Sequence, residues 1–341
     1  MRKARSDSVY IVMVKREARR GRVPLANRPM TDGAPRRGMP ATRRGSATMQ
    51  SHTSEPVHLR AADGQVLAAT HFLPEGPARG AVVLASATGV PRRFYAPFAA
   101  YLAGRGHAVL TFDYRGVGES APERLRGYEA TMAQWGTQDL AAALAWMAER
   151  HPEVPQRVVG HSVGGQVLGL APPERLERLA GVLLVASQGG YWGMWRGAGR
   201  GVMLFTWYAL IPGMTALLGY LPMRRFGQGE DLPAGVAKQW ARWGRHPGYF
   251  LADEEVRSAP GYARLRAPLR SYAVTDDAYA PLTGVQWLVS RYPNARAEVR
   301  SVSPAEAGLR KLGHFGFFRD KARDSLWAEA AQWLEAAHSP A

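Results

Sequence analysis

The sequence predicts an α/β protein in which a mainly parallel sheet carries helices on both faces. Short apolar runs without polar alternation, such as 80–85, 157–160 and 181–185, are typical of strands buried on both sides. Stretches with apolar residues at helical spacing separate these runs, and such alternation favours right-handed crossovers between parallel strands. With 341 residues, of which 46% are hydrophobic, the chain is long enough to bury this core.

The first 48 residues differ from the rest of the chain. They hold 13 Lys+Arg against 3 Asp+Glu, or +10, so the remaining 31 basic and 25 acidic residues carry only +6 of the total +16. We expect a disordered basic leader, an organelle transit peptide, or a mis-annotated start with Met39 or Met49 as the first residue. Because the excess charge lies in this leader, and no basic helix interleaved with aromatic residues follows, we expect no nucleic-acid partner.

The body of the chain begins with a hairpin. Residues 57–73 alternate around Asp63-Gly64, the dipeptide preferred in type I′ turns. A buried strand, a helix stopped by Gly104 and Gly106, a strand, an amphipathic helix and another strand are then predicted at 80–87, 94–106, 108–114, 132–150 and 157–162. Further strands follow at 181–187, 268–275 and 297–303, with helices at 281–292 and 325–337, which makes an eight-stranded sheet.

One segment breaks this rhythm. Between Ser187 and Leu269 no sheet strand is evident, and we expect a helical lid at 188–268, inserted after the sixth strand between two core parts, 49–187 and 269–341. Residues 201–223 contain no charged side chain and could span a bilayer. Because Pro212-Gly213 interrupts them, we expect lid helices over a substrate cleft and no membrane partner.

Composition excludes several kinds of chemistry. The chain has no cysteine, so disulfides, thiol nucleophiles and cysteine-ligated zinc are absent, and a reducing, cytoplasmic location is expected. The run GVGES (116–120) follows a strand but lacks the full dinucleotide-binding pattern. We expect neither a cofactor nor a metal site, and the oligomeric state stays open.

The run GHSVGG (160–165) predicts a nucleophile. Ser162 follows a predicted strand and precedes an apolar segment that can open as a helix. Such an elbow strains the serine backbone and leaves no room for flanking side chains, which is the reason for Gly160 and Gly164. The helix N-terminus would offer N–H groups to a developing oxyanion. His161 is expected to pack beneath the site.

A serine nucleophile needs a base, and in folds with this elbow an acid and then a histidine follow it in the chain. After Ser162 only three histidines remain. His338 is close to the C-terminus and His246 falls in the insertion, whereas His314 follows the last predicted strand. His314 is therefore the expected base.

The acid is expected at the end of a strand, where catalytic groups gather in such sheets. Asp276 and Asp277 both stand there, in YAVTDDAYAP (272–281). Asp277, four residues before Pro281, has the better register for facing the histidine. Asp276 stays an alternative, and otherwise would be a turn carboxylate or a helix cap.

Four motifs together resemble the α/β-hydrolase superfamily over residues 57–337. They are GHSVGG, DYRGVGES (113–120), TDDAYAP (275–281) and GHFGFF (313–318). With QWARWGRHPGYF (239–250), they are similar to bacterial hydrolases related to serine aminopeptidase-like and monoacylglycerol-lipase-like enzymes. The resemblance implies Ser162 as nucleophile, Asp277 as acid and His314 as base.

The resemblance also implies an oxyanion hole made of backbone N–H groups. Many members carry His-Gly after the third strand, where this chain has Ser86-Ala87-Thr88-Gly89. Val163 is then the expected first donor, and Thr88 or Ala87 the second.

The expected function is that of a serine hydrolase. It would cleave a small apolar or lipid-like ester, an amide or a thioester through an acyl-enzyme. Acyl transfer on the same triad, or a non-catalytic membrane-associated binding protein, are the alternatives. Aromatic residues of the insertion would either line an apolar substrate site or pack in the core: Trp192, Trp195, Phe205, Trp207 and Tyr208.

Overall fold

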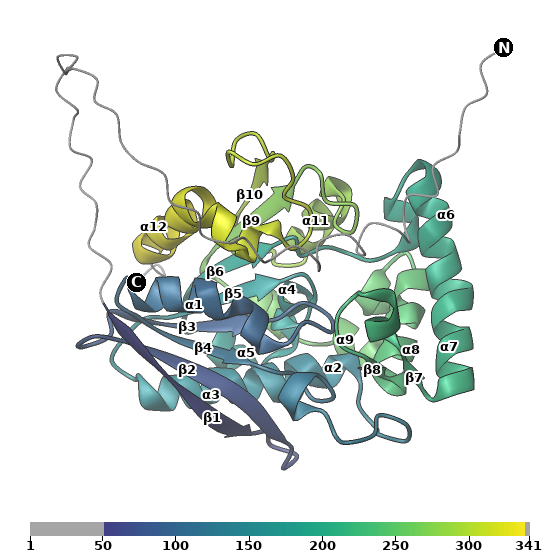
Figure 1. Cartoon of the computed structure of the whole chain (residues 1–341), viewed down its shortest axis with the longest axis horizontal. Coiled ribbons are helices and arrows are strands. Elements are labelled where there is room, and N and C mark those ends of the chain that lie inside the picture. Colours follow the sequence, from purple (N-terminus) through teal and green to yellow (C-terminus); the bar gives the residue numbers. More distant parts are fainter. Residues whose placement is uncertain (1–50, 338–341) are drawn as a thin grey trace, which may run out of the picture.

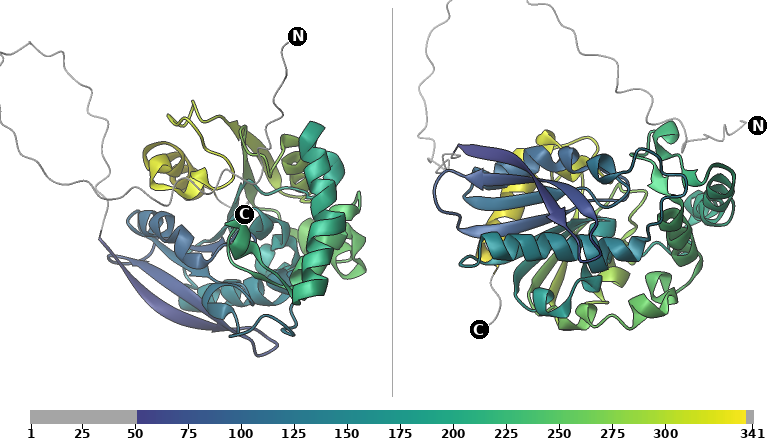
Figure 2. Two further views of the ribbon diagram at one scale, coloured as in Figure 1. Left: turned by 45° about the vertical axis from the view of Figure 1, so that its right-hand side comes forward. Right: turned by 90° about the horizontal axis from the view of Figure 1, so that it is seen from below.

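The computed structural model describes residues 51–337, which are built around one eight-stranded sheet (Figures 1 and 2). The expectations for residues 1–48 lie outside the described residues. In spatial order the strands are β1 (His52–Arg60), β2 (Val66–Pro74), β4 (His107–Phe112), β3 (Gly80–Ala85), β5 (Gln156–His161), β6 (Leu179–Val185), β9 (Pro268–Val274) and β10 (Arg296–Val302). Only β2 runs antiparallel to its neighbours. The predicted fold class is confirmed.

Helices cover both faces of the sheet because the buried strands present apolar side chains to both. In β3, Val82 and Leu84 belong to one hydrophobic cluster and Val83 to the other. Helices α1 (Ala96–Ala103) and α12 (Ala328–Ala336) lie over the first face, and α2 (Met132–Gln134) and α3 (Ala141–Arg150) over the second (Figure 1). The remaining helices of the core are α4 (Val163–Gln166), α5 (Pro173–Leu176) and α11 (Leu282–Val289).

The segment between β6 and β9 forms the expected insertion. It contains α6 (Gly197–Phe205), α7 (Ile211–Leu218), α8 (Ala234–Arg245), α9 (Glu254–Arg257) and α10 (Gly261–Arg264). It also contains β7 (Tyr220–Leu221) and β8 (Leu232–Pro233), which pair with each other. These two strands lie in the segment expected as a helical lid, and strands of two residues carry no readable alternation.

Helices α6 and α7 form one continuous helix, contrary to the interruption expected at Pro212. A wider, π-helical turn over Thr206–Leu210 joins them. Proline has no N–H to donate, and its ring clashes with the carbonyl four residues before it in a regular helix. An enlarged turn just before Pro212 relieves that clash, so the chain continues as a helix to Leu218.

The hairpin β1–β2 is present, but its turn is not the predicted type I′. The connection is the five-residue loop 61–65 between Arg60 and Val66, which are partners in the ladder. Gly64 has a φ of +86°, whereas Asp63 is not among the non-glycine residues with positive φ, and type I′ requires a positive value at both. The Asp63 carboxylate instead accepts hydrogen bonds from Arg115 at 2.6 and 3.1 Å.

The run DYRGVGES serves the scaffold. Asp113 accepts the backbone N–H of Arg92 at 2.6 Å and pairs with its guanidinium, which holds the segment leading into α1 against the end of β4. Ser120 accepts the N–H of Ala68 and donates to the carbonyl of Asp113. These contacts connect the loop after β4 to strand β2 and to the segment before α1.

Candidate active site

The elbow at Ser162 has the strain that the glycine pattern predicts. Ser162 directly follows β5 and has a φ of +52°, a left-handed value that L side chains rarely adopt. A Cβ at Gly164 would overlap the carbonyl oxygen of Ala85 in β3, and one at Gly160 would lie 2.8 Å from the amide nitrogen of Gly165. Only glycine fits at both positions, because the elbow backbone packs directly on its neighbours.

The helix behind Ser162 is much shorter than expected. Helix α4 covers only Val163–Gln166, and a tight turn follows at Leu168–Leu170. A single turn has a small dipole, so stabilisation of an oxyanion here depends on individual N–H groups rather than on a helix field. The Val163 N–H, at the start of α4, makes no hydrogen bond to another described residue.

Two of the three expected catalytic side chains are in direct contact. His314 Nδ1 lies 2.7 Å from Asp277 Oδ2, and both side chains are almost completely buried. Asp277 Oδ1 accepts the backbone N–H groups of Tyr279 at 2.8 Å and Ala280 at 3.1 Å. With one carboxylate oxygen held by the backbone, the other is fixed toward the imidazole, which places the histidine proton on Nδ1 and leaves Nε2 as an acceptor.

Asp276 has a different partner. Its carboxylate accepts the backbone N–H groups of Leu312 at 3.0 Å and Gly313 at 2.8 Å. It therefore holds the loop that carries His314 without touching the imidazole. The geometry favours Asp277 over Asp276 as the acid.

His161, the residue before Ser162, packs against His314. The rings of His161 and His314 have centroids 4.9 Å apart, and His161 Nε2 donates to the carbonyl of His314 at 2.9 Å. Within residues 51–337 no hydrogen bond joins the Ser162 hydroxyl to the imidazole of His314. Catalytic contacts of this kind are often long before substrate binds, and one rotation of the serine side chain moves its hydroxyl considerably.

A chain of hydrogen bonds links the oxyanion loop to this site. The Ala87 N–H donates to Tyr95 Oη at 2.8 Å, and Tyr95 Oη lies 2.8 Å from His161 Nδ1. Because His161 Nε2 donates to a carbonyl, Nδ1 accepts the proton of the Tyr95 hydroxyl. Each polar atom in this series of hydrogen bonds, from the Ala87 N–H to the His314 carbonyl, therefore has a partner. Burial lowers the pKa of His161 well below its usual 6.5, with His314 adding to the effect, so His161 stays neutral.

This chain of hydrogen bonds contradicts the expectation for Ala87 as an oxyanion donor. Its N–H is already donated to Tyr95 Oη, 2.8 Å away. The N–H of Thr88 makes no hydrogen bond to another described residue, so Val163 and Thr88 are the two of the three expected donors whose N–H groups are free. Tyr95 itself was missed by sequence reasoning, because nothing in its local pattern distinguishes it from an ordinary core tyrosine.

We expect Tyr95→Phe to weaken both fold and site. The change leaves the Ala87 N–H and His161 Nδ1 buried without partners, so the free energy of unfolding should fall by about 1–3 kcal/mol. A shift of the loop that carries Thr88 should lower kcat by about tenfold. Urea unfolding and steady-state ester hydrolysis measure the two effects.

The control for that experiment is Tyr101→Phe. Tyr101 is buried in α1 within the same hydrophobic cluster, but it has no part in the hydrogen bonds at Ala87 and His161. A loss of activity as large in Tyr101→Phe as in Tyr95→Phe would contradict the positioning role.

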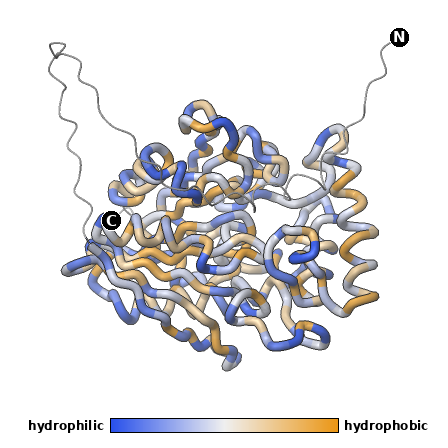
Figure 3. Tube along the Cα trace, viewed as in Figure 1, coloured by the Kyte–Doolittle hydropathy of each residue, from blue (hydrophilic) through white to orange (hydrophobic). Residues whose placement is uncertain are grey.

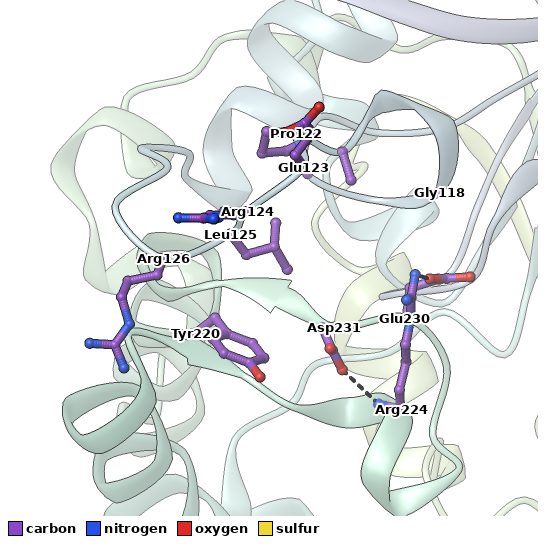
Figure 4. Close-up of a pocket in the computed structure, with 12 residues that line it drawn as sticks. Gly118, Pro122, Glu123, Arg124, Leu125, Arg126, Tyr220, Arg224, Glu230 and Asp231 are labelled. Carbon is purple, nitrogen blue, oxygen red and sulfur yellow. Dashed lines mark hydrogen bonds and ion pairs between the residues drawn. The ribbon is translucent and has the colours of Figure 1, made fainter.

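Two hollows lie beside the insertion. One, of about 330 Å³, reaches Asp277 and is lined largely by the start of the insertion and the loop after β9, including Trp195, Arg196, Pro281 and Leu282. The other, of about 480 Å³, lies between the loop after β4 and the β7–β8 region, and Arg124, Tyr220 and Asp231 are among its lining residues (Figure 4). Only the first touches a candidate catalytic residue.

The aromatic residues of the insertion divide three ways. Trp207 is buried in the core and Trp195 lines the hollow at Asp277, where its indole N–H donates to the carbonyl of Ala278. Phe205 and Tyr208 do neither, since both are exposed on the outside. His246 caps its own turn through Gly248, and within residues 51–337 no group of His, Asp and Glu could hold a metal.

A protein family and a known lipase match part of the chain by sequence. The sequence profile of the serine aminopeptidase S33 family matches residues 76–219, which include Ser162 but neither Asp277 nor His314. Rat monoglyceride lipase is 30% identical over 129 residues, or 38% of this chain and 42% of the lipase. The chain thus matches about two-fifths of the length of that relative.

Solved structures resemble the fold as a whole. An esterase from Pyrococcus furiosus superimposes with a TM-score of 0.54 at 15% identity, covering 84% of this chain and 92% of the esterase. Brefeldin A esterase, a bacterial homologue of human hormone-sensitive lipase, gives 0.55 at 16% identity, covering 87% and 80%. At these identities the likeness concerns the fold.

Proposed function

Since the chain is a member of the α/β-hydrolase superfamily, we propose that it is a serine hydrolase of the carboxylesterase or lipase type. Ser162 is the nucleophile, His314 the base and Asp277 the acid. Two observations carry the proposal: His314 and Asp277 form a buried pair, and Ser162 stands in a strained, glycine-flanked elbow whose preceding residue, His161, packs on the ring of His314. A serine with a purely structural role requires neither a strained backbone nor a buried His–Asp pair.

The reaction follows from the roles of these groups. Ser162 Oγ attacks the ester carbonyl carbon while His314 Nε2 takes its proton, and Asp277 stabilises the imidazolium. The N–H groups of Val163 and Thr88 bind the oxyanion of the tetrahedral intermediate. His314 then gives the proton to the departing alcohol, leaving an acyl-enzyme, and a water molecule repeats the sequence to release the acid and free serine.

The proposed substrate class rests on the hollow at Asp277, which reaches the acid of the triad but is not lined by Ser162. Its volume of about 330 Å³ is at the lower end of the range for small-molecule sites, and Trp195, Pro281 and Leu282 give it apolar walls. We infer a carboxylic ester with a compact apolar group. Monoglyceride lipase, a partial relative by sequence, is named for a substrate of this chemistry. Ser162 is only 7% exposed, so the residues that cover it must move before a substrate can reach its hydroxyl.

A fluorophosphonate probe tests the proposal. Such probes phosphonylate only activated serines, so the folded wild-type chain should be labelled and Ser162→Ala should not. Ser258→Ala, which removes an exposed hydroxyl that donates to Glu254, is the matched control and should label like wild type. Absence of labelling in correctly folded wild type would exclude the mechanism. Hydrolysis of p-nitrophenyl esters of increasing acyl length then measures the preferred substrate size.

A further inference from the structure

The helix Gly197–Leu218 is apolar on its outer as well as its inner face. It has 22 residues, and only 17% of its most apolar stretch is buried. In a helix on the surface of a globular protein, the outward face is normally polar. Here Val202, Phe205, Tyr208 and Leu217 point outward with 36%, 59%, 54% and 71% of their surface exposed. Val202, Phe205 and Tyr208 follow one another at intervals of three residues, the spacing of neighbours on a helix surface.

The position of this helix in the molecule also leaves its outer face uncovered. The helix lies at one edge, away from the central sheet, and its trace is mostly apolar over the length that Figure 3 displays. Contiguous apolar surface of this kind on a soluble protein marks a place where something else binds.

The inner face of the helix excludes a transmembrane arrangement. Trp207 and Ile211 are buried, and the ring centroids of Trp207 and Trp240 of helix α8 lie 4.9 Å apart. The Trp207 indole also donates to the carbonyl of Gly190. Inserting the helix across a bilayer would break these contacts, whereas contact through its outer face alone leaves them in place.

The charges at the ends of the helix indicate the chemistry of the partner. Between residues 196 and 229 the chain has four arginines and no acidic residue. Arg196 and Arg200 stand at the N-terminal end, and Arg225 lies in the turn Met223–Phe226 that follows the helix and β7. None of these three pairs with a carboxylate within the described residues. Arg245 lies over the ring of Tyr208, with 5.7 Å between the guanidinium carbon and the ring centroid.

We propose that the outer face of Gly197–Leu218 docks on an anionic lipid surface. Phe205, Tyr208 and Leu217 enter the boundary between headgroups and acyl chains, and the arginines at both ends contact lipid phosphates. A second copy of the chain is a poorer occupant, because two such faces in contact would bring the same cationic ends together. The helix lies in the plane of the surface, and about 33 Å of its length contacts lipid.

This docking would bring the hollow at Asp277 close to lipid. Arg196 and Gly199, at the start of the helix, also line that hollow, together with the exposed Leu282. An apolar ester could pass from the lipid surface to the site without crossing water. The docking itself does not depend on the proposed reaction.

Vesicle co-sedimentation of the full chain tests the proposal. We expect binding to vesicles of phosphatidylcholine mixed with phosphatidylglycerol, and weaker binding to phosphatidylcholine alone. The double variant Phe205→Ser/Leu217→Ser should bind both vesicles at least about tenfold more weakly, because it removes the inserted apolar groups. Arg196→Gln/Arg225→Gln should lose about fivefold per arginine on the mixed vesicles only.

Two controls make each outcome decisive. Val66→Ser removes an exposed apolar side chain from β2 and should bind like wild type, and so should Ser162→Ala, which separates docking from catalysis. Failure of wild type to sediment with mixed vesicles overturns the proposal, as does equal binding by wild type and Phe205→Ser/Leu217→Ser. Dimerisation in analytical ultracentrifugation that this double variant abolishes would instead identify a second copy as the occupant.

Discussion

Asp277→Asn is expected to lower kcat by about 10⁴-fold without unfolding the protein. The backbone N–H groups of Tyr279 and Ala280 bind Oδ1, so the asparagine keeps its oxygen there and turns its NH₂ toward His314. Nδ1 must then accept, which moves the imidazole proton to Nε2. A histidine protonated on Nε2 cannot take the proton of Ser162, and the charge that stabilises the imidazolium is also lost. Single-turnover hydrolysis of a p-nitrophenyl ester measures the effect.

Asp276→Asn is the matched control, since it makes the same chemical change one residue earlier. It weakens one of the two hydrogen bonds that hold the loop of His314, so the cost is about 0.5–1.5 kcal/mol and at most about tenfold in kcat. A larger loss in Asp276→Asn than in Asp277→Asn would reverse the assignment of the acid. Melting temperatures above the assay temperature for both variants show that the difference in kcat is catalytic.

Prediction from sequence succeeds where a local pattern has one structural cause. The buried strands could be recognised because both faces of a parallel sheet demand apolar residues, and the sheet has the expected eight strands. Gly160 and Gly164 indicated an elbow because no side chain fits there, and Ser162 indeed has a positive φ. The pairing of His314 with Asp277 needed only chain order and strand ends.

Two of the expectations that failed depend on contacts that the local sequence pattern does not show, and the third on a local exception to the rule for proline. Asp63 was read from its neighbour Gly64 as part of a type I′ turn, but Arg115 binds its carboxylate across the hairpin. Ala87 was expected as a possible oxyanion donor, but its N–H donates to Tyr95. The turn before α1 brings Tyr95 close to it. At Pro212 the local rule for proline was overridden by a π-helical turn that keeps the helix continuous. No period or motif in the sequence records such contacts.

The second large effect is expected for Asp139→Ala, which should lower the free energy of unfolding by about 3–5 kcal/mol. Asp139 is fully buried. Its carboxylate accepts two hydrogen bonds from Arg115, one from Nε at 2.7 Å and one from the backbone N–H of Arg115 at 2.9 Å. Burial raises the pKa of Asp139 to about 6, although Arg115 opposes the rise, so the carboxylate is charged at neutral pH. Its removal leaves a buried guanidinium that Asp63, at the surface, neutralises only in part. Urea unfolding at neutral pH measures the loss.

A double-mutant cycle separates the ion pair from ordinary packing. Asp139→Leu/Arg115→Met replaces both charges by apolar groups, so no buried charge is left uncompensated, and this chain should be more stable than Asp139→Leu alone. If the double variant is instead less stable by the sum of the two single losses, the two side chains contribute independently and the pair is not the cause. The position of Arg115 makes coupling the expected result, since its guanidinium joins Asp139 under the sheet to Asp63 in the hairpin loop, and losing either end frees the other.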